Sequence, residues 1–244
     1  MIDIHRSRGV TQSDAYFFDI DGTLLVNRDL VHYNALHQAM LDVYGIDTNI
    51  DGLPYHGKTD VAILRAALAR CGVSAEIFEA RLPAALAMVC REVSTHAHVI
   101  APSVCPGIPE VLSRIQAEGK LLGVASGNLE AVGWCKITAA NLRSFFSCGS
   151  FGDRHEFRAA IFDQAVALAR ARLGGRARVC FIGDTPDDVH AARSVNAQIV
   201  AVSTGTFGLD ELAALNPDAC YSSCCELLAH WELARRPEDF LARP

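Results

Sequence analysis

The stretch AYFFDIDGT, residues 15–23, decides the fold. Its apolar start lacks the polar alternation of a half-exposed strand, which predicts a buried strand of a parallel sheet. Asp19 and Asp21 follow at the strand end, two residues apart and therefore on the same side. Ligands of open α/β sheets bind at the carboxyl ends of strands. Gly22 lets the chain turn and brings backbone amides towards an anion, although this motif alone is also typical of an ordinary strand-to-turn junction.

Similar apolar runs and intervening helical patterns extend through the second half of the chain. The further strands are predicted at residues 121–126, 179–184 and 199–203, and the helices at 109–119, 156–175 and 185–194. In the last helix, Thr185 is expected at the cap and Pro186 at the first helical position. Strands that alternate with helices predict an α/β fold with a Rossmann-like parallel-sheet core.

One interval, residues 28–101, has no convincing buried strand and reads as three helices. Pro83 is expected to divide or bend the last of these helices. An insertion of this size can hold a small core of its own. We therefore predict an α/β core from residues 1–27 and 102–244 and a small helical cap domain from residues 28–101. The end of the chain, RRPEDFLARP, is predicted to be a surface appendage.

Composition limits the classes of partner. The 244 residues carry a net charge of −6 and lack the basic surplus that non-specific nucleic-acid binding needs. No apolar run is long enough for a membrane span, and the first fifteen residues lack a signal-peptide pattern. We expect a cytoplasmic protein with no nucleic-acid and no membrane partner, while a small anionic substrate stays compatible with this charge.

The nine cysteines are scattered, odd in number and without a C-x-x-C pair, so reduced thiols are expected. The stretch CYSSCC, residues 220–225, offers three of them. It lacks a histidine or a second cysteine pair at zinc spacing, which argues against a metal cluster.

Polar groups end two more of the predicted strands. Ser126 begins SGN, where a hydroxyl and backbone amides suit phosphate oxygens. Asp184 and Asp188 lie in GDTPDD, where crowded carboxylates would repel each other unless a cation such as Mg²⁺ joins them. Each stretch alone is also typical of a helix cap or of charge placed at a helix N-terminus. Three such strand ends in one sheet favour a phosphate and Mg²⁺ site.

Together these stretches resemble the haloacid dehalogenase superfamily, and specifically its phosphatases. DIDGT resembles the first motif of that superfamily, ASGN the second and GDTPDD the fourth, and the resemblance covers nearly the whole chain. The helical insertion resembles the cap of phosphoglycolate phosphatase-like members. The interval from Ser126 to Asp184 leaves no room for the larger cap that other members carry there.

The resemblance implies a mechanism. Asp19 would attack phosphorus and form an aspartyl-phosphate, and Asp21 would protonate the leaving alcohol and then activate water. Mg²⁺ would bind Asp19, Asp184 and the backbone carbonyl of Asp21, and Asp188 would hold the metal shell or a positive side chain. Ser126 would hydrogen-bond the phosphoryl oxygens. Further phosphate-binding groups are expected at Gly22, Thr23, Gly127 and Asn128.

The third motif departs from the family pattern. Members usually place a lysine about 25 residues before the first aspartate of the fourth motif, but no lysine follows Lys136. Arg158 is the candidate replacement, because arginine stays charged and donates two hydrogen bonds to a phosphate or carboxylate. Arg154 is the next candidate, and an ordinary solvated helix residue is the alternative for Arg158. Dehalogenases and phosphonatases of the superfamily lack an aspartate at the position of Asp21, so its presence favours phosphate esters.

The stretch GLPYHGKT, residues 52–59, spells the G-x-x-x-x-G-K-T pattern of a nucleotide-binding P-loop. A genuine P-loop follows a buried strand and opens a helix, whereas no strand is predicted here and Pro54 interrupts the loop. GKTD also resembles a cap segment of phosphoglycolate phosphatase-like proteins. Lys58 is therefore expected to face the active site from the cap, with an ordinary surface lysine as the alternative.

The leading hypothesis is a Mg²⁺-dependent phosphatase that acts on a small phosphorylated metabolite. A sugar phosphomutase of the same superfamily would use the same nucleophile and acid. A non-catalytic phosphate-binding protein is disfavoured because it has no need for the pair Asp19 and Asp21. The sequence leaves the identity of the ester and the oligomeric state open.

Overall fold

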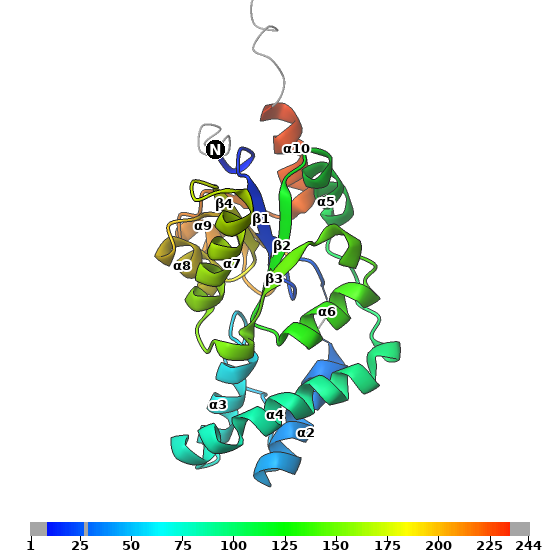
Figure 1. The fold of residues 1–244 in the computed structure, drawn as a ribbon, viewed down its shortest axis with the longest axis vertical. Helices are drawn as coiled ribbons and strands as arrows, with labels where there is room; N and C mark the ends of the chain where they lie inside the picture. The colour runs from blue at the N-terminus through cyan, green and yellow to red at the C-terminus, as the bar shows by residue number, and fades with distance from the viewer. Residues whose placement is uncertain (1–8, 27–28, 235–244) are drawn as a thin grey trace, which may run out of the picture.

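In the computed structural model, which describes residues 9–26 and 29–234, six parallel strands form one sheet with β1 near its centre (Figure 1). The strand order is β3-β2-β1-β4-β5-β6. The bounds are Ala15–Phe18 for β1, Leu121–Ala125 for β2, Cys148–Ser150 for β3, Val179–Gly183 for β4, Gln198–Val202 for β5 and Ala219–Tyr221 for β6. The predicted Rossmann-like α/β fold is confirmed, and β3 and β6 are strands that the sequence analysis did not predict.

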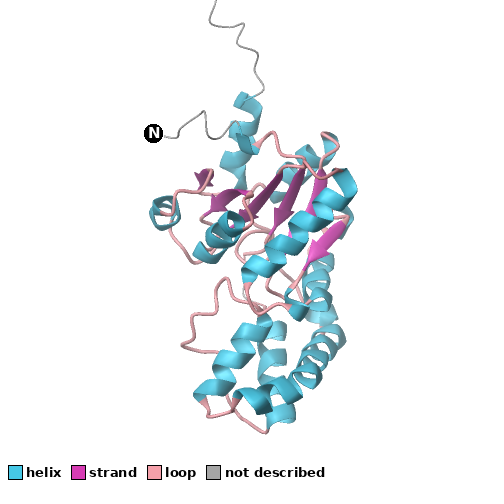
Figure 2. Cartoon of the chain, turned by 60° about the vertical axis from the view of Figure 1, so that its left-hand side comes forward, coloured by secondary structure: helices cyan, strands magenta, loops and turns pink. Residues whose placement is uncertain are grey.

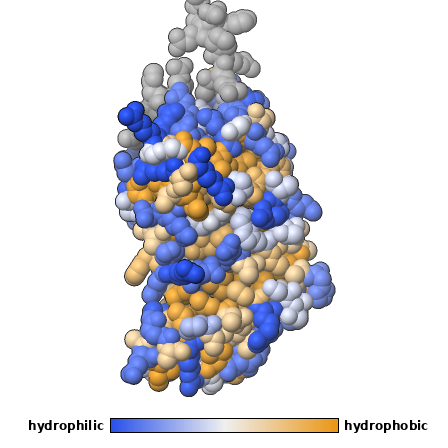
Figure 3. Space-filling view, viewed as in Figure 1, coloured by the Kyte–Doolittle hydropathy of each residue, from blue (hydrophilic) through white to orange (hydrophobic). Residues whose placement is uncertain are grey.

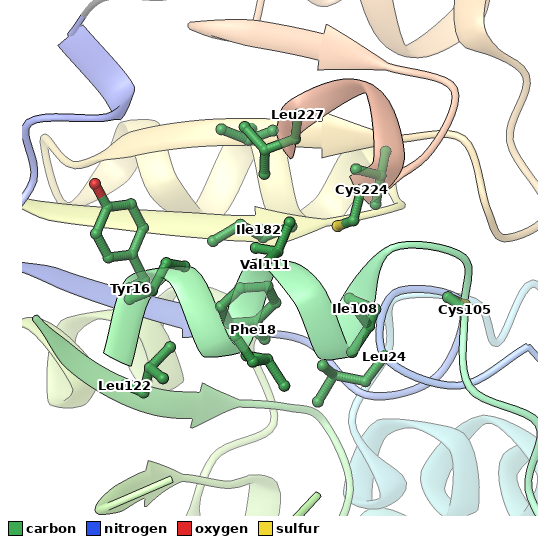
Figure 4. Close-up of a cluster of buried hydrophobic side chains, with 14 of the residues drawn as sticks. Tyr16, Phe18, Leu24, Cys105, Ile108, Val111, Leu122, Ile182, Cys224 and Leu227 are labelled. Carbon is green, nitrogen blue, oxygen red and sulfur yellow. The ribbon is translucent and has the colours of Figure 1, made fainter. Parts of the chain in front are cut away.

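Helices cover both faces of the sheet because alternate residues of each strand point to opposite sides. Tyr16 and Phe18 of β1 face the helices α5 (Ile108–Ala117) and α10 (Cys224–Ala234), as Figure 4 shows for part of this cluster. Phe17 faces the opposite cluster. That cluster is formed with α7 (Arg158–Leu173), α8 (Pro186–Ser194) and α9 (Leu209–Ala214). Burial on both faces explains why the strands read as continuous apolar runs.

A separate group of helices lies beside one end of the sheet (Figure 2). It consists of α2 (Leu30–Tyr44), α3 (Asp60–Arg70), α4 (Ala75–Thr95) and the short helix η1 (Ala97–Val99). Helices α2, α3 and α4 share a hydrophobic cluster to which Leu129 and Val132, at the start of α6 (Glu130–Ala139), also contribute. The division at residue 28 lies outside the described residues, so the two-domain boundary stays a prediction.

Pro83 lies inside α4, which is one continuous helix. Of the two expected effects of this proline, division of the helix is therefore wrong, and a bend stays a prediction. Phe78 on one side of Pro83 and Ala85 and Val89 on the other are buried in the same cluster. Packing on both sides of the proline keeps the two segments in one helix despite the lost backbone hydrogen bond.

The chain enters and leaves this helical group at neighbouring points. Leu25 and Val104 form an antiparallel bridge. The Val26 amide donates to the Ser103 carbonyl at 2.8 Å, and the Cys105 amide donates to the Leu24 carbonyl at 2.9 Å. The two connections are thus held together beside the strand end at Asp19.

The surface mixes hydrophilic and hydrophobic residues, with apolar areas over the lower helices in the view of Figure 3. Ile77 and Val99 are among the exposed apolar residues of this part. No helix in the described ranges is long and apolar enough to cross a membrane. All nine cysteines are free, and those of CYSSCC join no metal-binding cluster within the described chain. The predicted appendage at residues 235–244 lies outside the described residues.

The aromatic stack behind the sheet gives a test of this core. Phe181 of β4 is fully buried and stacks on Phe162 with ring centroids 3.8 Å apart. Phe181→Ala should lower the free energy of unfolding by about 3–5 kcal/mol, because it leaves a cavity between sheet and helix. Leu173→Ala, at a side chain that is 45% exposed, should change it by less than about 0.5 kcal/mol. Denaturant unfolding of both variants measures the difference, and equal losses would contradict this packing.

Candidate active site

Three strand ends converge on one pocket of about 380 Å³. Asp19 follows β1, Ser126 follows β2 and Asp184 follows β4, and all three line this pocket. The opposite wall comes from the helical group and the loop before α3, including Tyr33, Ile50, Tyr55 and Lys58. The predicted site thus lies between the sheet and the helices that follow the first motif.

The centre of the pocket is a cluster of buried carboxylates. Asp19, Asp184 and Asp188 each offer an oxygen within 4.8 Å of the others. Burial raises the pKa of Asp19 to about 6; the Arg158 charge opposes this increase, and Asp188 and Asp21 add to it. Burial and the neighbouring Asp19 and Asp188 raise the pKa of Asp184 well above its usual range. Ionising all three groups is costly without additional positive charge.

Arg158 supplies part of that charge. It is the first residue of α7, where Nη2 lies 2.7 Å from Asp19 Oδ2 and Nε lies 2.6 Å from Asp188 Oδ1. Its Nη1 also donates to the Gly57 carbonyl at 3.1 Å. The planar guanidinium thus spans two carboxylates and the loop of the helical group. Arg154, the other candidate for this position, is exposed.

The start of α8 fixes the direction of Asp188. Thr185 is the N-cap, Pro186 is the first helical residue, and Asp188 completes a capping box, as the sequence predicts for the cap. Asp188 Oδ2 accepts from the Thr185 amide at 3.0 Å and from its hydroxyl at 2.7 Å. These bonds leave the other carboxylate oxygen directed at Arg158, so Asp188 acts on the cluster through a positive side chain.

The turn after Asp19 packs directly against Asp184. Gly22 has a φ of +87°, and a Cβ there would lie 2.2 Å from Asp184 Oδ2. Glycine is required both by this conformation and by the close approach. Thr23 is fully buried and its hydroxyl donates to Asp184 Oδ1 at 3.0 Å. The side chain of Thr23 therefore orients a carboxylate, while its predicted phosphate contact stays a prediction.

Asp21 is held differently from Asp19. Lys136 Nζ lies 3.0 and 2.9 Å from its two carboxylate oxygens, and Asn128 Nδ2 donates to Oδ2 at 2.8 Å. Burial acts to raise the pKa of Asp21, but the Lys136 ammonium and the Asn128 hydrogen bond outweigh it and keep this pKa below its usual value. The proposed contact of the Asp21 backbone carbonyl with a metal stays a prediction.

The loop after β2 combines a hydroxyl with backbone groups. Ser126 is buried, and its Oγ accepts from Asn128 Nδ2 at 2.9 Å. A Cβ on Gly127 would lie 2.4 Å from the Lys58 carbonyl, so this loop closely contacts the loop of the helical group. Ser126, Gly127 and Asn128 all line the pocket. Their predicted phosphate contacts are compatible with this placement.

The stretch GLPYHGKT is a loop before α3, and residues 45–51 directly before it contain no strand in the described chain. It therefore lacks the strand that a P-loop requires. Lys58 lines the pocket and its Nζ lies 2.7 Å from Asp187 Oδ2. This ion pair joins the loop to the start of α8. It contributes little stability, because 44% of the Lys58 side chain is exposed.

Three polar residues of this site were missed by the sequence analysis. Lys136 on α6 contacts Asp21, while His32 on α2 and Asp60 on α3 lie behind it. A lysine two helical turns after Asn128, in the mostly apolar helix EAVGWCKITA, is the one signal that could have indicated Lys136. His32 and Asp60 lie on separate helices, and no sequence spacing relates them to the strand ends.

The acidic cluster has the chemistry of a Mg²⁺ site. Mg²⁺ prefers hard oxygen ligands and is usually held by one or two carboxylates and water. Asp184, whose hydrogen bond comes from the neutral Thr23 hydroxyl, and Asp19 border the pocket. Their raised pKa values show that a further cation would relieve the repulsion. The residues therefore fit the ion.

The chain is similar in sequence to known hydrolases. A family model described as haloacid dehalogenase-like hydrolase matches residues 16–202. A phosphoglycolate phosphatase of Synechococcus elongatus is 31% identical over 124 residues, which are 50% of this chain and 57% of that protein. The chain thus matches little more than half the length of this curated relative.

Solved structures share the fold at low identity. The CbbY protein of Rhodobacter sphaeroides, determined with phosphate, is 18% identical with a TM-score of 0.66, covering 91% of this chain and 100% of that chain. A β-phosphoglucomutase of Clostridium difficile is 15% identical with a TM-score of 0.64, covering 95% and 100%. A phosphate-bound protein and a mutase therefore share this architecture.

The raised pKa values predict how pH and Mg²⁺ act on stability. Since the folded pKa of Asp19 is raised to about 6, this carboxyl group binds more protons in the folded protein than in the unfolded chain. The contribution of this group to metal-free stability is therefore greater at about pH 5 and is lost as the pH rises through about 6. Mg²⁺ should offset this loss and raise the melting temperature by about 5–10 °C at 100 times its Kd and about pH 7.5.

The shift should be much smaller at about pH 5, where protons compete with the ion. Asp184→Asn should remove most of the Mg²⁺ shift, and the exposed Asp42→Asn should keep it. Thermal unfolding with and without Mg²⁺ measures each case. A Mg²⁺ shift that is the same in Asp184→Asn as in the wild type would show that the ion binds elsewhere.

Proposed function

The chain belongs to the haloacid dehalogenase-like hydrolases, and on this basis we propose that it is a Mg²⁺-dependent phosphatase of small phosphomonoesters. The observation that carries the proposal is the pairing of two aspartates with opposite environments. Asp19 lies in the carboxylate cluster beside Arg158, and Asp21 lies beside Lys136 and Asn128. One carboxylate is placed to react and the other to exchange protons at the same pocket.

In the first step, a carboxylate oxygen of Asp19 attacks phosphorus and the bond to the ester oxygen breaks, which gives an aspartyl-phosphate and an alcohol. Arg158 at 2.7 Å holds Oδ2 of Asp19 and so orients the attack. Ser126 and the backbone amides of the following residues would donate hydrogen bonds to the phosphoryl oxygens. Bound Mg²⁺ would supply positive charge for the transferring phosphoryl group.

Asp21 would give a proton to the leaving oxygen in the first step and take one from water in the second. That water attacks phosphorus, releases inorganic phosphate and restores the Asp19 carboxylate. Asn128 and Lys136 hold the two oxygens of Asp21 and fix its direction. The same group can thus serve both half-reactions without moving far.

The helical group would select the ester. Its side of the pocket combines aromatic and aliphatic side chains with polar ones, among them His32, Asp60 and, at the loop, Lys58. We propose that Lys58, whose exposed pair with Asp187 is easily broken, contacts the leaving group of the substrate. A volume of about 380 Å³ suits a small metabolite. The curated phosphoglycolate phosphatase supports hydrolysis over phosphomutase activity.

The nucleophile is tested by Asp19→Asn. The amide cannot form the acyl phosphate, so turnover should fall by about 1000-fold or more. Phosphate release from a panel of phosphorylated metabolites, with Mg²⁺ present, is the measurement, and Asp42→Asn on the exposed face of α2 is the matched control. Phosphate release at the wild-type rate in Asp19→Asn would refute the mechanism. Conversion of a sugar phosphate to its isomer without phosphate release would favour the mutase, and no turnover at all would favour a binding protein.

Arg158 has its own test. Arg158→Met removes the buried positive partner of Asp19 and Asp188, so kcat should fall by about 100–1000-fold. Arg158→Lys should keep the charge but lose the three-way contact, with an intermediate loss. Arg154→Met, at an exposed position, should match the wild type. If Arg154→Met were the damaging change, Arg154 would hold the role assigned to Arg158.

A further inference from the structure

Lys136 is a buried cation that the mechanism above uses only as a contact of Asp21. It is 2% exposed and lies on α6. Its Nζ contacts both Asp21 oxygens, Asn128 Oδ1 at 3.0 Å and His32 Nδ1 at 3.1 Å. An ammonium can donate only three protons, so these four acceptor atoms occupy its full hydrogen-bonding capacity, with at least one proton shared between two of them. A lysine is rarely buried to this extent unless such partners compensate its charge.

The contact with Lys136 fixes the tautomer of the His32 ring. Since a lysine ammonium only donates, His32 Nδ1 must accept, and the ring proton lies on Nε2. His32 Nε2 lies 3.2 Å from Asp60 Oδ1. Asp60, His32 and Lys136 therefore form a chain of polar contacts that ends on Asp21. Asp60 and Lys136 are also almost fully buried.

Asp60 connects this chain to the position of the helical group. Its amide donates to the Gly127 carbonyl at 3.0 Å, and its Oδ2 accepts from the Leu129 amide at 2.8 Å. Asp60 thus contacts His32 through one oxygen and the loop after β2 through the other. Displacing α3 from that loop would break the contacts that hold the far end of the chain.

We propose that Lys136 is a positioning residue that fixes the carboxylate of Asp21, and that His32 and Asp60 hold Lys136 in place when the helical group contacts the loop after β2. The proposal rests on the proposed role of Asp21 in phosphatase chemistry. It connects the placement of the proton-transferring group to the docking of the substrate-selecting helices. Proton transfer would then be efficient only in the docked arrangement.

A purely structural role would not need these groups. Burying an ion pair costs solvation energy, and apolar side chains of similar volume often replace such pairs without loss of stability. A methionine at position 136 could fill much of the same space. A role in positioning predicts instead that the loss appears in one chemical step and disappears when Asp21 is absent.

The first test compares two esters in Lys136→Met. A simple alkyl phosphate needs a proton on its leaving group, whereas an activated aryl phosphate does not. We expect kcat for the alkyl ester to fall by about 100-fold, the usual cost of a displaced reacting group. The loss for the aryl ester should be about tenfold smaller, and KM should change little. Lys120→Met, far from the pocket at the start of β2, is the control and should match the wild type.

The second test is a double-mutant cycle with Asp21→Asn. If Lys136 acts through Asp21, adding Lys136→Met to Asp21→Asn should change kcat by less than about twofold. His32→Phe, which removes one acceptor of Lys136 and leaves Asp21 intact, should give the same preference for the aryl ester with a smaller loss. This variant also carries the test if Lys136→Met does not fold.

Equal losses on both esters, or a full additional loss in the Asp21→Asn background, would overturn the proposal. If the wild type hydrolyses neither of these esters nor any member of the metabolite panel, the phosphatase assignment fails. The contact between Lys136 and Asp21 is then judged by thermal unfolding of the wild type, Lys136→Met, Asp21→Asn and the double variant. Lys136→Met should lower the melting temperature less in the Asp21→Asn background than in the wild type. An equal decrease in both backgrounds would show that the two side chains are not coupled.

Discussion

The repulsion among three buried carboxylates is the constraint on which the rest of the site depends. Asp19, Asp184 and Asp188 cannot lie within 4.8 Å of one another as charged groups without compensation. The negative charge is compensated by Arg158 and by hydrogen bonds from Thr23 and Thr185. The arrangement of the carboxylates also fits a divalent cation. The first turn of α7, the capping box of α8 and the glycine turn after β1 all have positions that follow from this requirement.

An arginine in place of the usual lysine changes how the site is connected. A guanidinium donates in several fixed directions, so Arg158 contacts two carboxylates and also the Gly57 carbonyl. A single ammonium is a point charge on a flexible stem and is less suited to all three. The Asp19 side of the pocket is thereby joined to the helical group through Arg158, and the Asp21 side through the separate contacts of Lys136 and His32.

Sequence patterns predicted the parallel sheet and the acidic strand ends because both depend on local order along the chain. A buried parallel strand followed by Asp19 or Asp184 places that residue at the carboxyl end of the sheet, whichever helices pack around it. Counting back from Asp184 was enough to select Arg158. The packing of three helices brings together Lys136, His32 and Asp60. The spacing of residues along the sequence does not indicate this packing. The strands β3 and β6 have three residues each and were too short to show a pattern. Pro83 does not divide α4, because packing on both sides of it overrides the local preference.

The paired connections at Leu25 and Val104 have a consequence for how such an enzyme can diversify. Because the two crossing points are already hydrogen-bonded neighbours, the segment between them can lengthen, shorten or be exchanged without moving the ends of the sheet. The residues proposed to carry out hydrolysis and those proposed to select the substrate then occupy separately replaceable stretches of one gene. A chimaera that carries a foreign helical segment between these points would keep Asp19 and Asp21, but it would lack His32 and Asp60, which contact Lys136 directly or through His32. The breadth of substrates reachable by segment exchange is therefore limited by a few buried polar residues rather than by the sheet.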